Sequence, residues 1–151
     1  MIWQVLAAML GVAAFGVLFH VPGRSYLPCA LAGGLSWGLY LLGQALGGSL
    51  FLATVIASAG LTLYSRLMAI GLCLPSTVLI VTGIFPLVPG AGIYYTAYYL
   101  MVGERELFAA KGLEALASAG AIALGILAGS EIPQKWLRRL AGLGIARKSK
   151  V

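Results

Sequence analysis

Hydrophobic residues form long uncharged blocks along this chain, separated by single charged positions. Residues 1–23, 25–65 and 67–103 contain no charged side chain. A helix that crosses the hydrocarbon core of a bilayer needs about 20 apolar residues, so the second block is long enough for two helices. Gly47-Gly48-Ser49 is the natural turn between them. The pattern therefore predicts membrane helices near Ile2–Phe19, Pro28–Leu46, Leu50–Leu67 and, after the third block, Leu113–Gly129.

The third block is too long for one straight membrane helix. Its 37 residues from Leu67 to Gly103 would extend over about 55 Å, whereas the hydrocarbon core is roughly 30 Å thick. Within it, Pro86-Leu87-Val88-Pro89-Gly90 interrupts the helix, because neither proline donates to the helical ladder and glycine lacks the Cβ that restricts the backbone. A bilayer accommodates such a break only where the freed backbone groups are buried in protein or line a watery cavity. Broken helices of this kind are typical of transport sites.

The composition assigns the chain to the membrane proteins. Of 151 residues, 61% are hydrophobic and 9% charged, and the mean hydropathy is +1.00, whereas ordinary soluble domains have roughly 25% charged residues. Ten basic and four acidic side chains cannot cover a soluble protein of this size. We therefore predict an all-α, polytopic membrane helix bundle of about five transmembrane helices, one of them broken at Pro86–Gly90.

The positions of lysine and arginine predict the orientation of the bundle. We expect a membrane domain over 1–134 and a basic tail over 135–151. The cations of the tail are Lys135, Arg138, Arg139, Arg147, Lys148 and Lys150. If the broken stretch crosses the membrane once, Arg24 and Arg66 lie on the side of the tail; if it re-enters or crosses twice, they lie on the opposite side. The positive-inside tendency favours one crossing, with the amino terminus outside and the tail in the cytoplasm, attracted to anionic lipid.

Small residues recur every four positions on several predicted helices. The longest series, in the last helix, is Ala117, Ala121, Gly125 and Gly129. Such a stripe lets helix backbones approach closely. We expect it to be a helix–helix contact inside the assembly, which replacement of Gly125 with leucine would disturb; homo-oligomers through the glycine faces are a further expectation.

The break supplies the main candidate binding residues, Pro86, Pro89 and Gly90. The helix that resumes near Gly90 turns its N–H groups and positive dipole end toward the break, which favours an anionic group such as a substrate carboxylate. Tyr94 follows one turn later. It belongs to a run of tyrosines over 94–99 that either lines a polar path or forms an interfacial aromatic belt.

Three other polar residues at membrane depth complete the set of candidate substrate-binding residues. Arg66 either snorkels to the headgroups or faces a cavity and holds a substrate carboxylate. His20 follows the first predicted helix and is either an interfacial residue or part of the site. Thr82 either hydrogen-bonds back to its own helix or binds a ligand.

Several of these segments resemble the threonine/serine exporter family. The resemblance rests on 16–22 (GVLFHVP), Cys29-Ala30-Leu31-Ala32-Gly33, Tyr64-Ser65-Arg66 and, above all, 84–90 (IFPLVPG) followed by Tyr94. It covers nearly the whole chain, and the chain is most similar to the small-component branch, which corresponds to the carboxyl-terminal half of the fused exporters. At position 20 the family usually has asparagine in place of histidine, and Arg66 matches a basic position of the family pattern.

The resemblance implies a two-component export system of the bacterial inner membrane. The small component would act with a larger membrane subunit and move threonine and serine or, in some members, small dicarboxylates such as succinate. Glu104, Glu106, Glu114 and Glu131 are expected in loops or at helix ends. Because proton coupling usually needs an intramembrane acid, we expect the larger subunit to supply it.

Other classes of function fit the residues less well. An enzyme is not expected, because the chain has no aspartate, one histidine and no metal-ligand spacing, and nothing calls for a cofactor or a metal. A nucleic-acid partner is not expected either, since the basic tail forms no recognition module. A non-transporting membrane scaffold would also be small and glycine-rich, but it has no physical need for a double-proline break.

Overall fold

The computed structural model describes residues 1–72, 75–133, 135 and 137, and in this part of the chain all regular structure is helical. The elements in chain order are α1 (Ile2–Leu18), η1 (Gly23–Ser25), α2 (Tyr26–Ala45), α3 (Leu50–Leu72), α4 (Ser76–Gly83), η2 (Phe85–Leu87), α5 (Gly90–Val102) and α6 (Arg105–Glu131). The all-α class is confirmed. The expected helices correspond to α1, α2, α3 and α6, although α3 continues beyond Leu67 and α6 begins well before Leu113.

Three helices end in the same hydrogen-bonded turn. In each case the backbone is left-handed just past the helix, at His20 (φ +53°), Gly47 (φ +79°) and Gly103 (φ +85°). After α2, the N–H of Gly48 donates to the carbonyl of Gly43 at 3.0 Å, which is the long bond of a Schellman motif. The turn predicted between α2 and α3 is thereby confirmed, and the turn at Gly103 joins α5 to α6.

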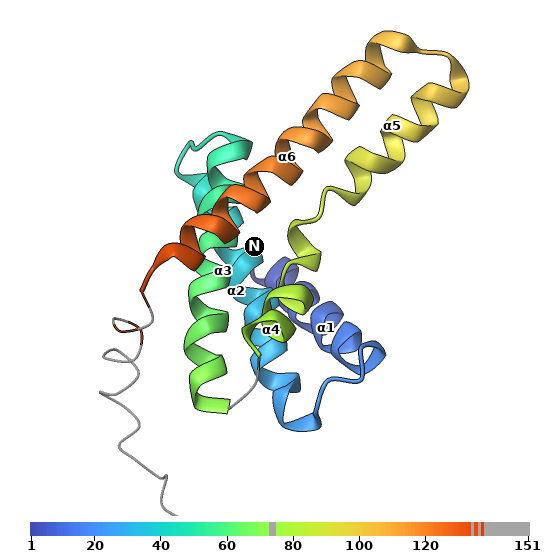
Figure 1. The fold of residues 1–151 in the computed structure, drawn as a ribbon. Coiled ribbons are helices and arrows are strands. Elements are labelled where there is room, and N and C mark those ends of the chain that lie inside the picture. The colour runs from blue at the N-terminus through green and yellow to red at the C-terminus, as the bar shows by residue number, and fades with distance from the viewer. Residues whose placement is uncertain (73–74, 134, 136, 138–151) are drawn as a thin grey trace, which may run out of the picture.

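The helices form a bundle from which one hairpin projects (Figure 1). α2 packs between α1 and α3, and α6 runs along the other side of α3. The short α4 lies against both α2 and α3. α5 packs mainly on α6, and every residue of α5 is at least partly exposed in the described chain. The α5–α6 hairpin therefore extends beyond the other four helices.

Small residues hold α3 and α6 together. A Cβ added at Gly125 would overlap Ser58 and the backbone of Val55 and Ala59, and one added at Gly129 would come within 2.7 Å of Thr62 Cβ. Ser58 and Thr62 are fully buried and donate to carbonyls one turn earlier on α3, so their hydroxyls are satisfied within the close contact. We call Ser58, Thr62, Gly125 and Gly129 the small-residue seam. The expected helix–helix contact at Gly125 is thus found inside a single chain.

The number of predicted membrane spans is not confirmed. By length and apolar composition, α3 and α6 can each cross a membrane, and α4–η2 with α5 make a third candidate that is bent by 55°. α1 is apolar but has 17 residues, and the glycines, Ser36 and Gln44 of α2 lower its hydropathy. Five spans therefore stay a prediction. The basic tail, except for 135 and 137, lies outside the described residues, so the division at residue 134 stays one too.

Candidate functional site

The predicted break is present and spans two short irregular steps. α4 ends at Gly83, η2 covers Phe85–Leu87, and α5 begins at Gly90. The N–H of Leu87 donates to the carbonyl of Ile84 at 2.8 Å, and the N–H of Gly90 donates to the carbonyl of Val88 at 2.7 Å. These local bonds replace helical ones that the two prolines cannot make. The chain consequently bends by 55° between the α4–η2 segment and α5.

Two neighbouring helices hold the break in place. The Ser36 hydroxyl of α2 donates to the carbonyl of Gly83 at 2.9 Å, and so satisfies one of the carbonyls freed at the end of α4. Ser36 is fully buried. On the other side, the ring of Phe85 stacks on that of Phe15 in α1, with centroids 4.0 Å apart. The position of the break is therefore fixed by a polar contact to α2 and an aromatic contact to α1.

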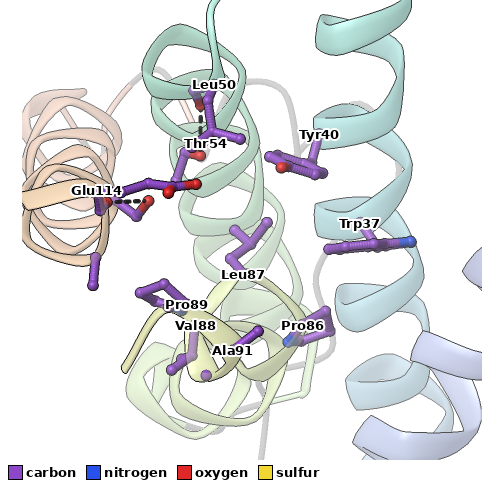
Figure 2. Close-up of a pocket in the computed structure, with 14 residues that line it drawn as sticks. Trp37, Tyr40, Leu50, Thr54, Pro86, Leu87, Val88, Pro89, Ala91 and Glu114 are labelled. Atoms are coloured by element: carbon purple, nitrogen blue, oxygen red, sulfur yellow. Dashed lines mark hydrogen bonds between the residues drawn. The ribbon is translucent and has the colours of Figure 1, made fainter. Parts of the chain in front are cut away.

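A cavity of about 280 Å³ lies directly above the break. Its floor is formed by residues 86–92, and its walls come from α2, α3 and α6 (Figure 2). The wall residues are Trp37, Tyr40, Leu50, Thr54, Glu114, Ala115 and Ser118. All three break residues proposed from the sequence, Pro86, Pro89 and Gly90, line this cavity. Its volume lies at the lower end of the range for small-molecule pockets, about 300 Å³ and above.

Glu114 lies in this cavity, and the expectation that it belongs to a loop or a helix end is wrong. It is the tenth residue of α6 (Arg105–Glu131), and its side chain extends toward Thr54 and Tyr40 above the break (Figure 2). Its carboxylate accepts a hydrogen bond from Lys111 Nζ at 2.8 Å. Glu114 is the one charged side chain among the described residues that line the cavity. An acidic group therefore stands beside the break within this chain.

The remaining walls combine aromatic rings with hydroxyl groups. The rings of Trp37 and Tyr40 stack with centroids 5.0 Å apart, and Gln44 Nε2 donates to the Tyr40 hydroxyl at 2.9 Å. Thr54 is buried and donates to the carbonyl of Leu50 at 2.8 Å. Its oxygen keeps capacity to accept a further hydrogen bond. The cavity thus offers aromatic side chains, hydroxyl oxygens and one carboxylate.

Two further cavities border the break, and both are apolar. One, of about 670 Å³, lies between α5 and α6 and includes Val88 and Pro89; the other, of about 410 Å³, lies against α1 and includes Pro86 and Gly90. Among the described residues neither lining contains a charged side chain. The polar groups around the break are therefore concentrated in the cavity that contains Glu114.

Arg66 lies apart from the cavity. Its Nη1 donates to the carbonyls of Gly129 and Ser130 at 2.8 and 2.9 Å. These carbonyls belong to the last turn of α6, where a cation is favoured by the helix dipole and by the unsatisfied carbonyl groups. In this structure Arg66 therefore joins α3 to the end of α6.

His20 and Thr82 also take up positions away from the cavity. His20 is the left-handed residue that follows α1, with its N–H bonded to Val17 and the N–H of Val21 bonded to Gly16, both at 3.0 Å. Asparagine and histidine are among the residues that tolerate this conformation best. The Thr82 hydroxyl is buried and donates to the carbonyl of Val78 at 2.9 Å, within its own helix.

The tyrosines of α5 lie on its surface. Tyr94 is 64% exposed and lines none of the three cavities at the break, and it stacks with Tyr98, one turn further along α5. Tyr95 and Tyr99 form a second stacked pair. In the described chain this aromatic face is open on the outside of the hairpin.

Sequence reasoning missed most of the cavity wall. Trp37, Tyr40 and Thr54 carry no motif, and they meet the break only because α2 and α3 pack beside it. The sequence does contain a local indication for Glu114, because Glu114 and Ser118 share one face of a helix at i, i+4 spacing. In the structure the Ser118 hydroxyl donates to the Glu114 carbonyl. In the described part of the chain, no three His, Cys, Asp or Glu side chains gather as metal ligands would.

The chain matches a protein-family model. The model described as "Threonine/Serine exporter, ThrE" covers residues 4–132, which include the break, the cavity and all of the described helices except the first two residues of α1. No curated protein and no solved structure matches the chain.

Proposed function

We propose that this chain, which belongs to the threonine/serine exporter family, is the small membrane subunit of a secondary transporter that exports small amino acids of the threonine and serine type together with a larger subunit. Family membership makes it an exporter-type membrane transport protein. The substrate, the partner and the residues that bind are our proposal. The cavity at the break is the observation that carries it.

The break supports a transport site because it exposes backbone groups to a cavity with polar walls. α5 begins at Gly90 without a side-chain cap. The N–H of Gly90 donates to Val88 and that of Ile93 donates to Pro89, so in the described chain the N–H groups without a backbone acceptor are those of Ala91 and Gly92, which line the cavity. These groups and the positive end of the α5 dipole stand at the floor of the cavity formed by Pro86, Pro89 and Gly90. A solute carboxylate that enters the cavity would be received there. A lipid-facing helix gains nothing from such an arrangement.

The contact of Arg66 with α6 supports a single crossing by the broken element. Arg66 donates to Gly129 and Ser130, so it lies at the depth at which the last helix ends and the basic tail begins. If the broken stretch crossed twice, Arg66 and the end of α6 would stand on opposite sides of the membrane. In our proposal α4, η2 and α5 are therefore one bent span, with Arg24, Arg66 and the tail on the cytoplasmic side of the bacterial inner membrane.

The open face of the α5–α6 hairpin supports a partner subunit. α5 is the second half of the broken span, yet within this chain it packs mainly on α6 and buries none of its residues in the described structure. A solute path along the break would thus have protein on one side only. In our proposal the larger subunit covers α5 and completes the path.

Export assays on the two subunits test this function. In an exporter-deficient strain, we expect efflux of labelled threonine or serine only when this chain and the larger subunit are expressed together. Succinate serves as the alternative cargo in the same assay. Efflux of succinate without efflux of threonine or serine would assign the dicarboxylate function. Robust efflux from cells that express this chain without the larger subunit would contradict the two-subunit proposal. If neither threonine, serine nor succinate leaves the cells, a non-transporting scaffold is the remaining function.

A further inference from the structure

We propose that Glu114 recognises the ammonium group of the exported amino acid, and that this residue makes the transporter select amino acids over carboxylates that lack an amine. The inference rests on the proposed function, because it assigns a specificity residue to the cavity at the break. The expectation that the larger subunit supplies the proton-coupling acid is unaffected, because here Glu114 binds the substrate and does not transfer the proton.

The first observation that supports this proposal is the charge of the cavity lining. Glu114 is the one charged side chain among the described residues that line it. Arg66, the cation that the sequence offered as a carboxylate ligand, is engaged by the Gly129 and Ser130 carbonyls instead. The cation paired with this carboxylate is Lys111, which is not part of the lining. A solute with a positive group can take the place of Lys111, whereas a second negative group finds no cationic side chain among the described lining residues. Succinate, with two carboxylates, matches that lining poorly.

The Lys111–Glu114 pair shows that this carboxylate accepts an ammonium. Lys111 Nζ lies 2.8 Å from Glu114 Oε2, and the two side chains are 40% and 50% exposed. An exposed ion pair at i, i+3 spacing contributes little to stability, because water screens the two charges. A substrate ammonium can therefore replace that of Lys111 at small cost, and Lys111 acts as a competitor that holds the carboxylate in the empty cavity.

The wall opposite Glu114 contains two aromatic side chains and a hydroxyl group. Trp37 and Tyr40 stand in the cavity beside Thr54, on the side toward which Glu114 extends (Figure 2). The rings of Trp37 and Tyr40 stack on each other in this wall. The buried hydroxyl of Thr54 has an oxygen lone pair available for an ammonium. The carboxylate and the hydroxyl, in a wall that also contains two aromatic side chains, form a site suited to a primary ammonium.

The test compares threonine with its counterpart that lacks the amine, 3-hydroxybutanoate. Everted membrane vesicles that contain this chain with the larger subunit take up labelled threonine, and unlabelled 3-hydroxybutanoate competes. For Glu114→Gln we expect the KM for threonine to rise about tenfold, as for loss of a charged hydrogen-bond partner, while competition by 3-hydroxybutanoate stays unchanged. The preference of the transporter for threonine over 3-hydroxybutanoate would then fall by the same factor.

Two control variants lie on the same helix. Glu106→Gln removes an acidic residue from the first turn of α6, outside the cavity lining, and should leave the KM unchanged. Lys111→Gln removes the competing ammonium and should lower the KM or leave it as it is. Recovery of each variant with the larger subunit from detergent shows that the complex has formed.

Each remaining outcome overturns the inference. If Glu114→Gln weakens the competition by 3-hydroxybutanoate as much as it raises the KM for threonine, the carboxylate serves proton transfer or folding. If Glu114→Gln leaves the KM unchanged, or Lys111→Gln raises it as much as Glu114→Gln, the ion pair is structural. Absence of uptake by the unmutated pair of subunits would instead refute the proposed function itself.

Discussion

The two sides of α6 are built in opposite ways. Toward α3, glycine and small hydroxyl residues bring the backbones into direct contact along the small-residue seam. Toward α5 and the break, the helix borders cavities, one of them with a carboxylate in its wall. Membrane helices associate by close packing of small residues, whereas polar groups at membrane depth are retained for function. The seam therefore supplies the rigid support, and the break supplies the space in which a solute moves.

The largest effect should come from filling the seam. Gly125→Leu would place a side chain where Ser58 and the backbone of Val55 and Ala59 already lie, and backbone cannot yield as a flexible side chain does. We expect a loss of more than about 3 kcal/mol of stability, seen as failure to recover folded, monodisperse protein in detergent.

Gly120→Leu is the matched control for this change. Gly120 lies on the same helix, and a Cβ there meets nothing within 4 Å. Normal recovery of Gly120→Leu beside loss of Gly125→Leu would locate the effect in the seam. Equal recovery of both variants would show that the close contact of α3 and α6 is not needed for the fold.

Straightening the break should abolish transport and leave the seam intact. With Pro86→Ala and Pro89→Ala together, the backbone can form helical hydrogen bonds through the break, and the floor of the cavity is lost. We expect efflux of threonine to fall at least about tenfold, while the complex with the larger subunit is recovered in normal yield. Unchanged efflux would favour a scaffold over a transporter.

Removing the cation that joins α3 to the end of α6 should affect stability and spare the cavity. Arg66→Gln loses the charged donor to Gly129 and Ser130, which should cost about 1–2 kcal/mol in thermal unfolding followed in detergent. The KM for threonine should not change, because Arg66 lines none of the three cavities at the break. A large rise in KM at unchanged stability would restore the hypothesis that Arg66 binds substrate.

The smallest effect is expected at the turn after α1. His20 has φ +53° and closes the helix with backbone bonds, so His20→Asn should change stability by less than about 0.5 kcal/mol, whereas the β-branched His20→Val should cost about 1–2 kcal/mol. Thermal unfolding of the two variants checks this. Loss of efflux in a stable His20→Asn variant would mean that the imidazole itself is needed.

The sequence predicted the elements whose cause is local. The long apolar blocks, the glycine turn at Gly47 and the proline break all follow from residue types at neighbouring positions, and the structure has them. The α5–α6 hairpin was harder to predict, because the charges at 104–114 resemble a loop. In the structure Gly103 makes a short turn and those charged residues begin a helix. Glu114, which we expected in a loop or at a helix end, therefore lies within α6 and in the cavity wall.

The parts that sequence reasoning missed depend on contacts between distant residues. Arg66 meets α6 at Gly129, and Ser36 meets α4 at Gly83, and neither pairing leaves a trace in the local pattern of residues. The wall of the cavity has the same origin, since Trp37 and Thr54 become neighbours only through the packing of α2 with α3.

The most direct test asks whether the cavity at the break carries water and solute. In a variant with Cys29 and Cys73 replaced by serine, Ser118→Cys places a thiol in the cavity wall, and Thr82→Cys places one in a buried position outside all three cavities. In membranes that also contain the larger subunit, a small hydrophilic thiol reagent should modify the first variant, more slowly when threonine is present, and leave the second unmodified. Equal lack of reaction at both positions, or modification of Ser118→Cys that saturating threonine does not slow, would contradict a solute path along the break.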